Sequence, residues 1–134
     1  MSIMRTIKFR GKSKRDGKWY IGNLYDKDIY GKTHICTINR GCLDIDPDTV
    51  GQFTGLRDNN GLEIYEGDII CSEKYKHIHV ISYDDSLGSF VGKTPGDRYG
   101  TFTGLMSQKW INDFDKEIIG NIHDNPELLK QQEL

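Results

Sequence analysis

His77 and His79 carry the side chains in this sequence best suited to holding a metal ion. They lie two positions apart in a segment typical of a β-strand, so they share one face of it. If the preceding turn spans residues 74–76, Cys71 lies opposite His79, whereas a two-residue turn places Cys71 on the other face. Two histidines without a C-x-x-C motif or a carboxylate partner are a weak zinc signal. We therefore predict no metal ligands, no cofactor and no stoichiometric zinc.

Three alternating acids, Asp44, Asp46 and Asp48, resemble the start of a calcium-binding EF-hand loop. Such a loop needs glycine at its sixth position and a bidentate glutamate at its twelfth. Here those positions hold Thr49 and Gly55. We predict a solvated loop instead, in which Asp48 caps a short turn at Thr49.

Nucleophilic catalysis requires a nucleophile, a base and an orienting group brought together. The sequence contains serines and histidines but no G-x-S-x-G elbow, no H-E-x-x-H helix and no phosphate-binding glycine loop. The neighbouring acids Asp84 and Asp85 lie in a polar turn and point to different sides. We predict no catalytic residues and a protein that is not an enzyme, with a metal-dependent enzyme as a distant third hypothesis.

The first 18 residues form a basic head on a chain whose net charge is −2. Asp16 is the single acid among them. Aromatic residues interleave with the cations, and small barrels use such faces to stack bases. The residues proposed for nucleic-acid contact are Lys8, Arg10, Lys12, Lys14, Arg15 and Lys18.

A second interpretation of the basic head needs no nucleic acid. Cations at the tip of a hairpin keep a strand edge from pairing with other chains. Phe9 and Trp19 are then core residues of a small domain. We keep nucleic-acid binding as an alternative, because a local basic patch on an acidic protein does not establish it.

The composition indicates one domain of a soluble globular protein. The chain has 134 residues, 36% hydrophobic and 28% charged. It contains no apolar run long enough to cross a membrane and no secretion signal at its start, which predicts a cytoplasmic location. Cys36, Cys42 and Cys71 form an odd set without metal-binding spacing, so each is expected to act as a small packing residue.

The pattern of β-branched residues and glycines predicts many short strands. Residues 7–10 and 19–25 are expected to form a hairpin. Further strands are predicted at 34–38, from Ile69, at 77–83 and at 117–122, with a loop-dominated region at 84–104. Asn125 and Pro126 are typical of a helix start, and the helix that follows can last only about two turns. Turn chemistry explains Gly55, Gly61, Gly67 and Asp68, and Gly67 is expected to have a positive φ.

Three blocks of this sequence resemble the YopX-like proteins of phages and prophages. The first contains Ile7-Lys8-Phe9-Arg10-Gly11-Lys12 with Trp19 and Gly22. The second runs from Thr49-Val50-Gly51-Gln52-Phe53-Thr54-Gly55-Leu56 to Ile64-Tyr65-Glu66-Gly67-Asp68-Ile69. The third contains Ile118-Ile119-Gly120-Asn121-Ile122 and Asn125-Pro126-Glu127-Leu128-Leu129. Phe53 and His123 stand where the family more often has tyrosine and another aromatic residue.

The resemblance implies a mostly β fold with an SH3-like barrel element, a phage or prophage origin and no assigned activity. We predict a mainly β protein: a small antiparallel barrel, an N-terminal hairpin and a short C-terminal helix. Residues 1–134 form a single YopX-like domain, with possible sub-parts 1–43 and 44–134. The leading hypothesis is a non-enzymatic binding or assembly protein in the bacterial cytoplasm. The alternative is a nucleic-acid-binding accessory protein.

The end of the chain predicts self-association. The apolar strand at 117–122 is followed by a helix too short to be stable alone in water, so Leu128 and Leu129 need a surface to pack on. That surface is either the chain's own barrel or a neighbouring subunit. Symmetric pairing also covers strand edges, and we therefore expect a homo-oligomer.

Overall fold

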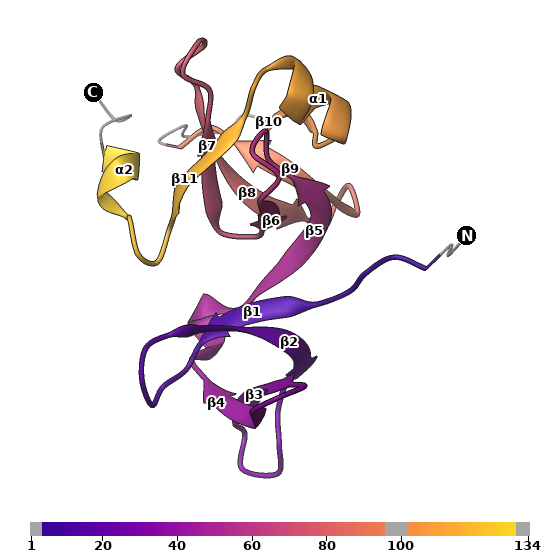
Figure 1. Ribbon diagram of the computed structural model, residues 1–134, viewed down its shortest axis with the longest axis vertical. Helices are drawn as coiled ribbons and strands as arrows, with labels where there is room; N and C mark the ends of the chain where they lie inside the picture. Colours follow the sequence, from indigo (N-terminus) through magenta and orange to yellow (C-terminus); the bar gives the residue numbers. More distant parts are fainter. Residues whose placement is uncertain (1–3, 96–101, 131–134) are drawn as a thin grey trace. The chain divides into compact units, whose positions relative to one another are not determined.

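The protein is mainly β and contains two antiparallel sheets and two short α-helices (Figure 1). The computed structural model describes residues 4–95 and 102–130. The first sheet contains β1 (Phe9–Lys12), β2 (Trp19–Tyr25), β3 (Thr33–Thr37), β4 (Gly41–Ile45), β5 (Gly51–Arg57) and β6 (Glu63–Tyr65). The second contains β7 (Asp68–Cys71), β8 (Ile78–Asp84), β9 (Ser89–Lys93), β10 (Phe102–Leu105) and β11 (Glu117–Asn121). The helices are the 3-10 turn η1 (Pro47–Thr49), α1 (Gln108–Asp113) and α2 (Glu127–Lys130).

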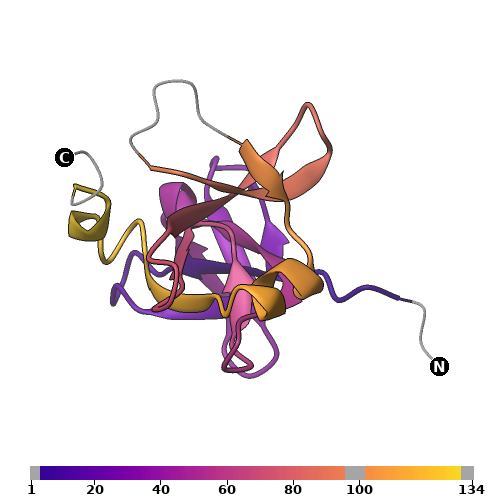
Figure 2. The same ribbon diagram turned by 90° about the horizontal axis from the view of Figure 1, so that it is seen from above.

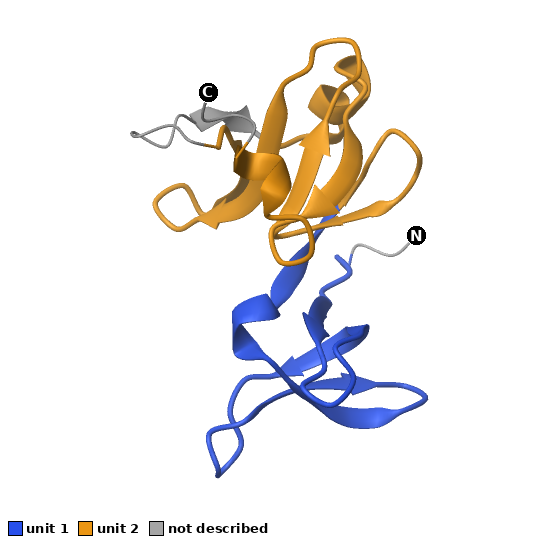
Figure 3. Ribbon diagram, turned by 90° about the vertical axis from the view of Figure 1, so that its left-hand side faces the viewer, with its two compact units in different colours: residues 1–55 blue, residues 56–134 orange. Residues whose placement is uncertain are grey.

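The chain divides into two compact units, Met1–Gly55 and Leu56–Leu134 (Figure 3). The strand order is β4-β3-β2-β1-β5-β6 in the first sheet and β10-β9-β8-β7-β11 in the second. β5 runs across the division between the units. Figure 2 shows α1 in orange and α2 in yellow at either end of the segment that contains β11.

The first unit is built on the predicted hairpin. β1 pairs with β2 from Phe9↔Gly22 to Lys12↔Trp19, and Gly17 turns between them with φ +69°. Ile35 and Ile45 are fully buried beneath this pair. A Cβ on Gly11 would lie 2.5 Å from the Cγ2 of Ile45, so the core comes too close to β1 for any larger residue there.

The second unit has a core of four isoleucines, Ile64, Ile70, Ile81 and Ile111, supplied by β6, β7, β8 and α1. Each of them is at most 1% exposed. β-branched residues suit the pleated surface of a strand, where they pack against their neighbours. This unit therefore has the continuous apolar interior that a small domain needs for stability.

Buried carboxylates hold the turns of the second unit. Asp68 is 2% exposed, and its Oδ2 accepts a hydrogen bond of 2.7 Å from the Tyr65 amide. Gly67 has φ +90°, as the sequence predicts for this turn. Gly61 also has a positive φ and lies in a turn, whereas Gly55 has φ +85° inside strand β5.

Several predicted elements are confirmed and others are wrong. The strands at 34–38, 77–83 and 117–122 and the short C-terminal helix are present with small shifts at their ends. The expected loop at 84–104 is wrong for its described part, because β9 and β10 lie in it, and residues 96–101 lie outside the described residues. The start of the expected loop at Asp44 is the end of β4 instead.

The expected small antiparallel barrel is not found as a closed barrel among the described residues. The middle block that was expected to form it is divided between β5 and β6 of the first sheet and β7 of the second. A single bridge, Ser13↔Ile45, joins the end of β4 to the residue after β1. The SH3-like likeness stays a prediction.

Within the parts of the chain that the structure describes, no helix has the length and apolar character to cross a membrane.

Candidate functional site

The β1–β2 turn is fixed by Asp16. Its carboxylate accepts hydrogen bonds from the Lys18 amide at 2.9 Å and from the Tyr20 hydroxyl at 2.6 Å. The bond from Tyr20 holds the pKa of Asp16 below its ordinary value and raises the pKa of Tyr20. Both groups therefore keep their charge states near neutral pH, and the Tyr20 ring is held beside the turn.

The six cations proposed for nucleic-acid contact fall into two groups. Lys8, Arg10 and Lys12 alternate along β1 and its approach, so they share one face, and all three are half-buried. The Lys8 Nζ lies 5.0 Å from the Phe53 ring centroid. The Trp19 ring lies under both Arg10 (Cζ at 4.8 Å) and Lys12 (Nζ at 5.5 Å). These cations pack on aromatic rings, in the way that long cationic side chains cover apolar surface.

The second group, Lys14, Arg15 and Lys18, is exposed at the turn between β1 and β2. The Lys14 amide bonds to the Asp44 carbonyl at 3.0 Å and the Arg15 amide to the Ser13 hydroxyl at 3.1 Å. The backbone there is ordered by these bonds while the side chains remain in solvent. The six cations are therefore not one continuous exposed patch.

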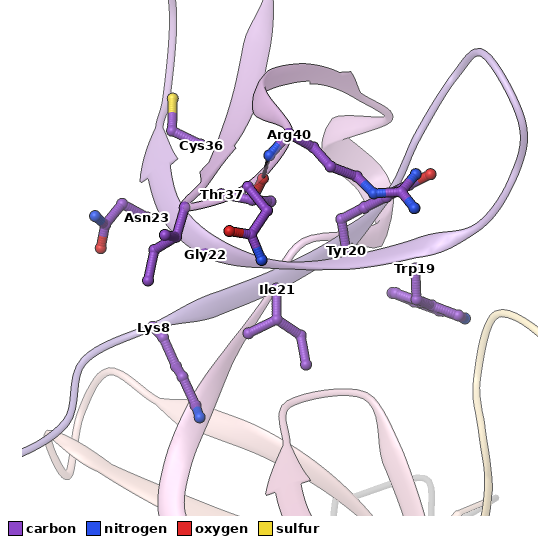
Figure 4. A pocket seen from close by; sticks show the side chains of 11 residues that line it. Lys8, Trp19, Tyr20, Ile21, Gly22, Asn23, Cys36, Thr37 and Arg40 are labelled. Carbon is purple, nitrogen blue, oxygen red and sulfur yellow. Dashed lines mark hydrogen bonds between the residues drawn. The ribbon is translucent and has the colours of Figure 1, made fainter.

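A pocket of about 530 Å³ opens in the first unit where β2 separates from β3 (Figure 4). β2 pairs with β3 only from Asn23↔Cys36 to Tyr25↔His34. Before Asn23, residues 19–22 pair with β1, and the chain after Thr37 turns into β4 instead. The gap between these two segments is the pocket.

Apolar and cationic side chains line the pocket together. Its apolar part consists of Trp19, Tyr20, Ile21 and Ile38. Its polar side chains include Lys8, Asn23, Asn39 and Arg40, and none of its 11 lining residues is an aspartate or glutamate. The pocket thus combines aliphatic surface with positive charge.

The turn between β3 and β4 supplies one wall. Cys36 and Cys42 are directly paired in the β3–β4 register and form a disulfide. The Arg40 amide donates a 2.9 Å hydrogen bond to the Thr37 hydroxyl, and Gly41 has φ +67°. The expectation that each cysteine is only a small packing residue is therefore wrong for Cys36 and Cys42, because they form a disulfide. Cys71 is a free cysteine.

Ile38 and Arg40 protrude from this turn. Ile38 is 102% exposed, and Ile21 across the gap is 48% exposed. The Arg40 guanidinium lies 5.8 Å from the Tyr20 ring centroid, and Figure 4 shows its side chain extending along the pocket toward Tyr20. Neither residue is predicted as a site residue from the sequence. The spacing of Cys36 and Cys42, six positions apart around the turn residues Asn39 and Gly41, is the sequence signal that would have indicated a disulfide-closed hairpin here.

His77 and His79 differ in burial and do not form a shared metal site with Cys71. Ile70 lies opposite His79 and Ile78 lies opposite Cys71, so the register does not place Cys71 across from His79. His77 is exposed, whereas His79 is 6% exposed. Among the described residues no group of three or more His, Cys, Asp or Glu side chains is arranged to hold a metal.

His79 instead belongs to a buried cluster. The Lys116 Nζ lies 3.4 Å from the His79 Nδ1, and the Trp110 ring contacts both side chains. Burial, followed by the charges of Lys116 and His77, lowers the pKa of His79 to about 4. Burial also lowers the pKa of Lys116, which is 2% exposed. Neutral His79 therefore accepts a hydrogen bond from Lys116, and this cluster is inaccessible to a large ligand.

The three alternating acids cap and pair within the first unit. Asp46, rather than Asp48, caps η1, because its Oδ1 accepts from the Asp48 amide at 3.1 Å. Asp44 lies 3.9 Å from the Lys32 Nζ. These contacts give Asp44 and Asp46 local structural roles.

Comparison with known proteins gives a family and similar solved structures. The YopX protein family matches residues 8–130. The crystal structure of protein EF1440 from Enterococcus faecalis is 27% identical, with a TM-score of 0.60, over 94% of this chain and 99% of that one. A search of curated proteins finds no match. The family match spans most of the chain and includes the three sequence blocks except Ile7, so this chain belongs to the YopX protein family.

Proposed function

We propose that this protein is a non-enzymatic binding protein, encoded by a phage or prophage, that acts through protein contacts in the cytoplasm of its bacterial host. A partner binds at the pocket between β2 and the β3–β4 turn. The observation that carries this proposal is the exposure of Ile38 and Ile21 at that pocket. Aliphatic side chains gathered around a hollow and bordered by polar groups are typical of interaction sites.

Nucleic-acid binding is the second candidate, supported by the exposed Lys14, Arg15 and Lys18. Base stacking requires accessible aromatic faces. Arg10 and Lys12 already pack on the Trp19 ring, and Arg40 lies over Tyr20. Ile21 and Ile38, the exposed isoleucines at the pocket, are aliphatic and cannot stack on bases. These features favour a protein partner.

The experiment is affinity capture from host cells after phage induction, followed by reconstitution with each purified candidate partner. Ile38→Asp introduces a charge at the pocket and should abolish binding of the partner. Ile29→Asp is the matched control, because Ile29 is 91% exposed in the same unit and does not line the pocket. A partner retained equally by both variants would contradict the proposed site.

A shift assay with a single-stranded oligonucleotide at two salt concentrations tests the second candidate. Binding through the hairpin should weaken steeply as salt rises. Charge reversal at Lys12, Lys14 and Arg15 should flatten that dependence. Tight binding that is insensitive to both changes would contradict a hairpin mechanism.

Self-association is proposed as a further mode of protein contact. α2 carries Leu128 and Leu129, both half-buried, and Ile119 on the neighbouring β11 is 43% exposed. Light scattering at tens of micromolar protein should show a homo-oligomer that is weakened by removal of the residues after Asp124. A monomer at that concentration would reject the oligomer.

A further inference from the structure

We infer that the pocket of the first unit binds an extended peptide segment that carries a carboxylate next to an apolar side chain. This inference rests on the proposed function and specifies the chemistry of the partner.

The backbone of β2 offers a strand edge to such a segment. In an antiparallel pair, residues alternate between those whose N–H and C=O point toward the partner strand and those whose groups point away. The Ser13 amide bonds to the Lys18 carbonyl, so the residues of β2 that point toward β1 are Tyr20 and Gly22. Ile21 therefore directs its N–H and C=O to the opposite side.

That opposite side is the pocket. β3 pairs with Asn23 and Tyr25 there, but the β2–β3 register ends at Asn23. Ile21 is the preceding position of the same alternation and lies next to the gap. An extended segment entering the pocket can hydrogen-bond to the Ile21 backbone and continue the ladder, as in other complexes formed by strand addition.

The size and lining of the pocket suit a few residues of peptide. A volume of about 530 Å³ lies within the roughly 300–1,000 Å³ typical of small-ligand sites. An apolar side chain of the segment would lie between Ile21 and Ile38. Both side chains lose water contact on binding, which is the main favourable term in such association.

Charge decides which segments fit. The pocket is lined by Lys8 and Arg40 and by no acidic residue. Within the described part of the chain, the Arg40 side chain contacts the Tyr20 ring and has no carboxylate partner. A guanidinium binds a carboxylate through two parallel hydrogen bonds, which favours an acidic segment over a neutral or basic one.

The disulfide prepares this wall before binding. Cys36 and Cys42 close the β3–β4 hairpin on either side of the turn that carries Ile38 and Arg40. A loop held in one conformation loses less entropy when its ligand arrives. The site is therefore formed by an already constrained turn and an existing strand edge.

The experiment is selection of a displayed library of random twelve-residue linear peptides against the full chain. We expect enriched peptides to pair Asp or Glu with an adjacent apolar residue. A synthetic enriched peptide, followed by fluorescence anisotropy, should bind Arg40→Glu at least tenfold more weakly than the unchanged protein. Replacing its acidic residue by lysine should abolish binding to the unchanged protein and restore binding to Arg40→Glu. Circular dichroism of the variants checks that they are folded.

The outcomes separate this inference from the proposed function. Peptides that lack an acidic residue but lose binding with Ile38→Asp and keep it with Ile29→Asp would overturn the charge requirement and leave the pocket as a protein-binding site. Enriched peptides that are insensitive to Ile38→Asp, or the absence of any enrichment, would overturn the peptide site. An oligonucleotide that binds the unchanged chain and loses affinity with Ile38→Asp would overturn the proposed function itself.

Discussion

The two units of this chain use isoleucine in different ways. In the second unit Ile64, Ile70, Ile81 and Ile111 form a continuous buried core, and Ile119 on β11 is 43% exposed. In the first unit Ile35 and Ile45 are buried, whereas Ile21, Ile29 and Ile38 are exposed. Single exposed apolar residues are common on any protein. Ile21 and Ile38 differ from such single residues because both line one cationic pocket, and this supports the proposed partner site in the first unit.

The β3–β4 turn at the pocket is fixed differently from the Asp58 turn of the second unit. In the second unit the buried Asp58 accepts hydrogen bonds from the amides of Asn60, Leu62 and Ile118, which joins a turn to β11. In the first unit the β3–β4 turn is closed by the Cys36–Cys42 disulfide. A turn fixed by a covalent link needs less surrounding protein, so its side chains can remain exposed for contacts.

The largest expected effect comes from the buried core of the second unit. Ile70→Ala should lower the free energy of unfolding by about 2–5 kcal/mol, because it removes buried methyl groups and leaves a cavity. Ile38→Ala, its counterpart in the first unit, should change stability by less than about 0.5 kcal/mol because that side chain is exposed. Urea unfolding measures both. Similar losses for the two variants would break the proposed difference between the units.

The second prediction concerns pH and His79. Its pKa of about 4 lies below the ordinary value of 6.5, so the unfolded chain binds this proton more readily than the folded chain. The resulting stability is fully present above pH 6.5 and is lost as pH falls toward 4. The full loss corresponds to about 3 kcal/mol.

Denaturant unfolding between pH 7 and pH 5 checks this prediction. In this range the stability of His79→Gln should fall less than that of the unchanged chain. Asp28, whose pKa is lowered to about 2 by its bond to His34, affects stability only at lower pH. Parallel curves for the two proteins would show that His79 is not the source of the pH dependence.

A smaller effect is expected at the Gly67 turn. Gly67→Val should destabilise the protein by more than ~1 kcal/mol, because a β-branched residue is strained at φ +90°. Gly67→Asn should cost less, since asparagine tolerates positive φ better. An unchanged melting temperature for the valine variant would contradict the role given to this turn.

A further prediction, which concerns no change in stability, is the number of reactive thiols. Protein purified without reductant and alkylated in denaturant should show one reactive thiol, that of Cys71. After reduction the count should rise to three. Three reactive thiols before reduction would mean that the β3–β4 turn is not covalently closed, and the proposed preorganisation of the pocket would fail. Disulfides are rare in a reducing cytoplasm, so three reactive thiols in host extract would mean that the turn is open at the proposed location.

Local patterns in the sequence predict much of this fold. The alternation around Phe9 and the turn at Gly17 predict the first hairpin, and Gly67 with Asp68 predicts the tight turn before β7. Strands β9 and β10 could not be predicted, because glycines and polar residues interrupt the pattern of apolar residues by which a strand is recognised.

The pocket could not be predicted in the same way. It depends on where β2 leaves β3, and a ladder's end is set by tertiary structure rather than by residue preference. The sequence predicts cationic contacts only for residues 8–18, whereas Arg40 lines the same pocket as Lys8 from a turn that is distant in sequence. The odd number of cysteines also argues against a disulfide, although Cys36 and Cys42 form one that closes this turn.

The most direct test of partner binding by the first unit is hydrogen exchange of the full chain, alone and with the purified partner identified by capture. Protection should appear in residues 19–23 and 36–40, which form the two sides of the pocket. The isoleucine core of the second unit should exchange at the same rate in both samples. Protection confined to residues 56–130, with residues 19–40 unchanged, would contradict the account.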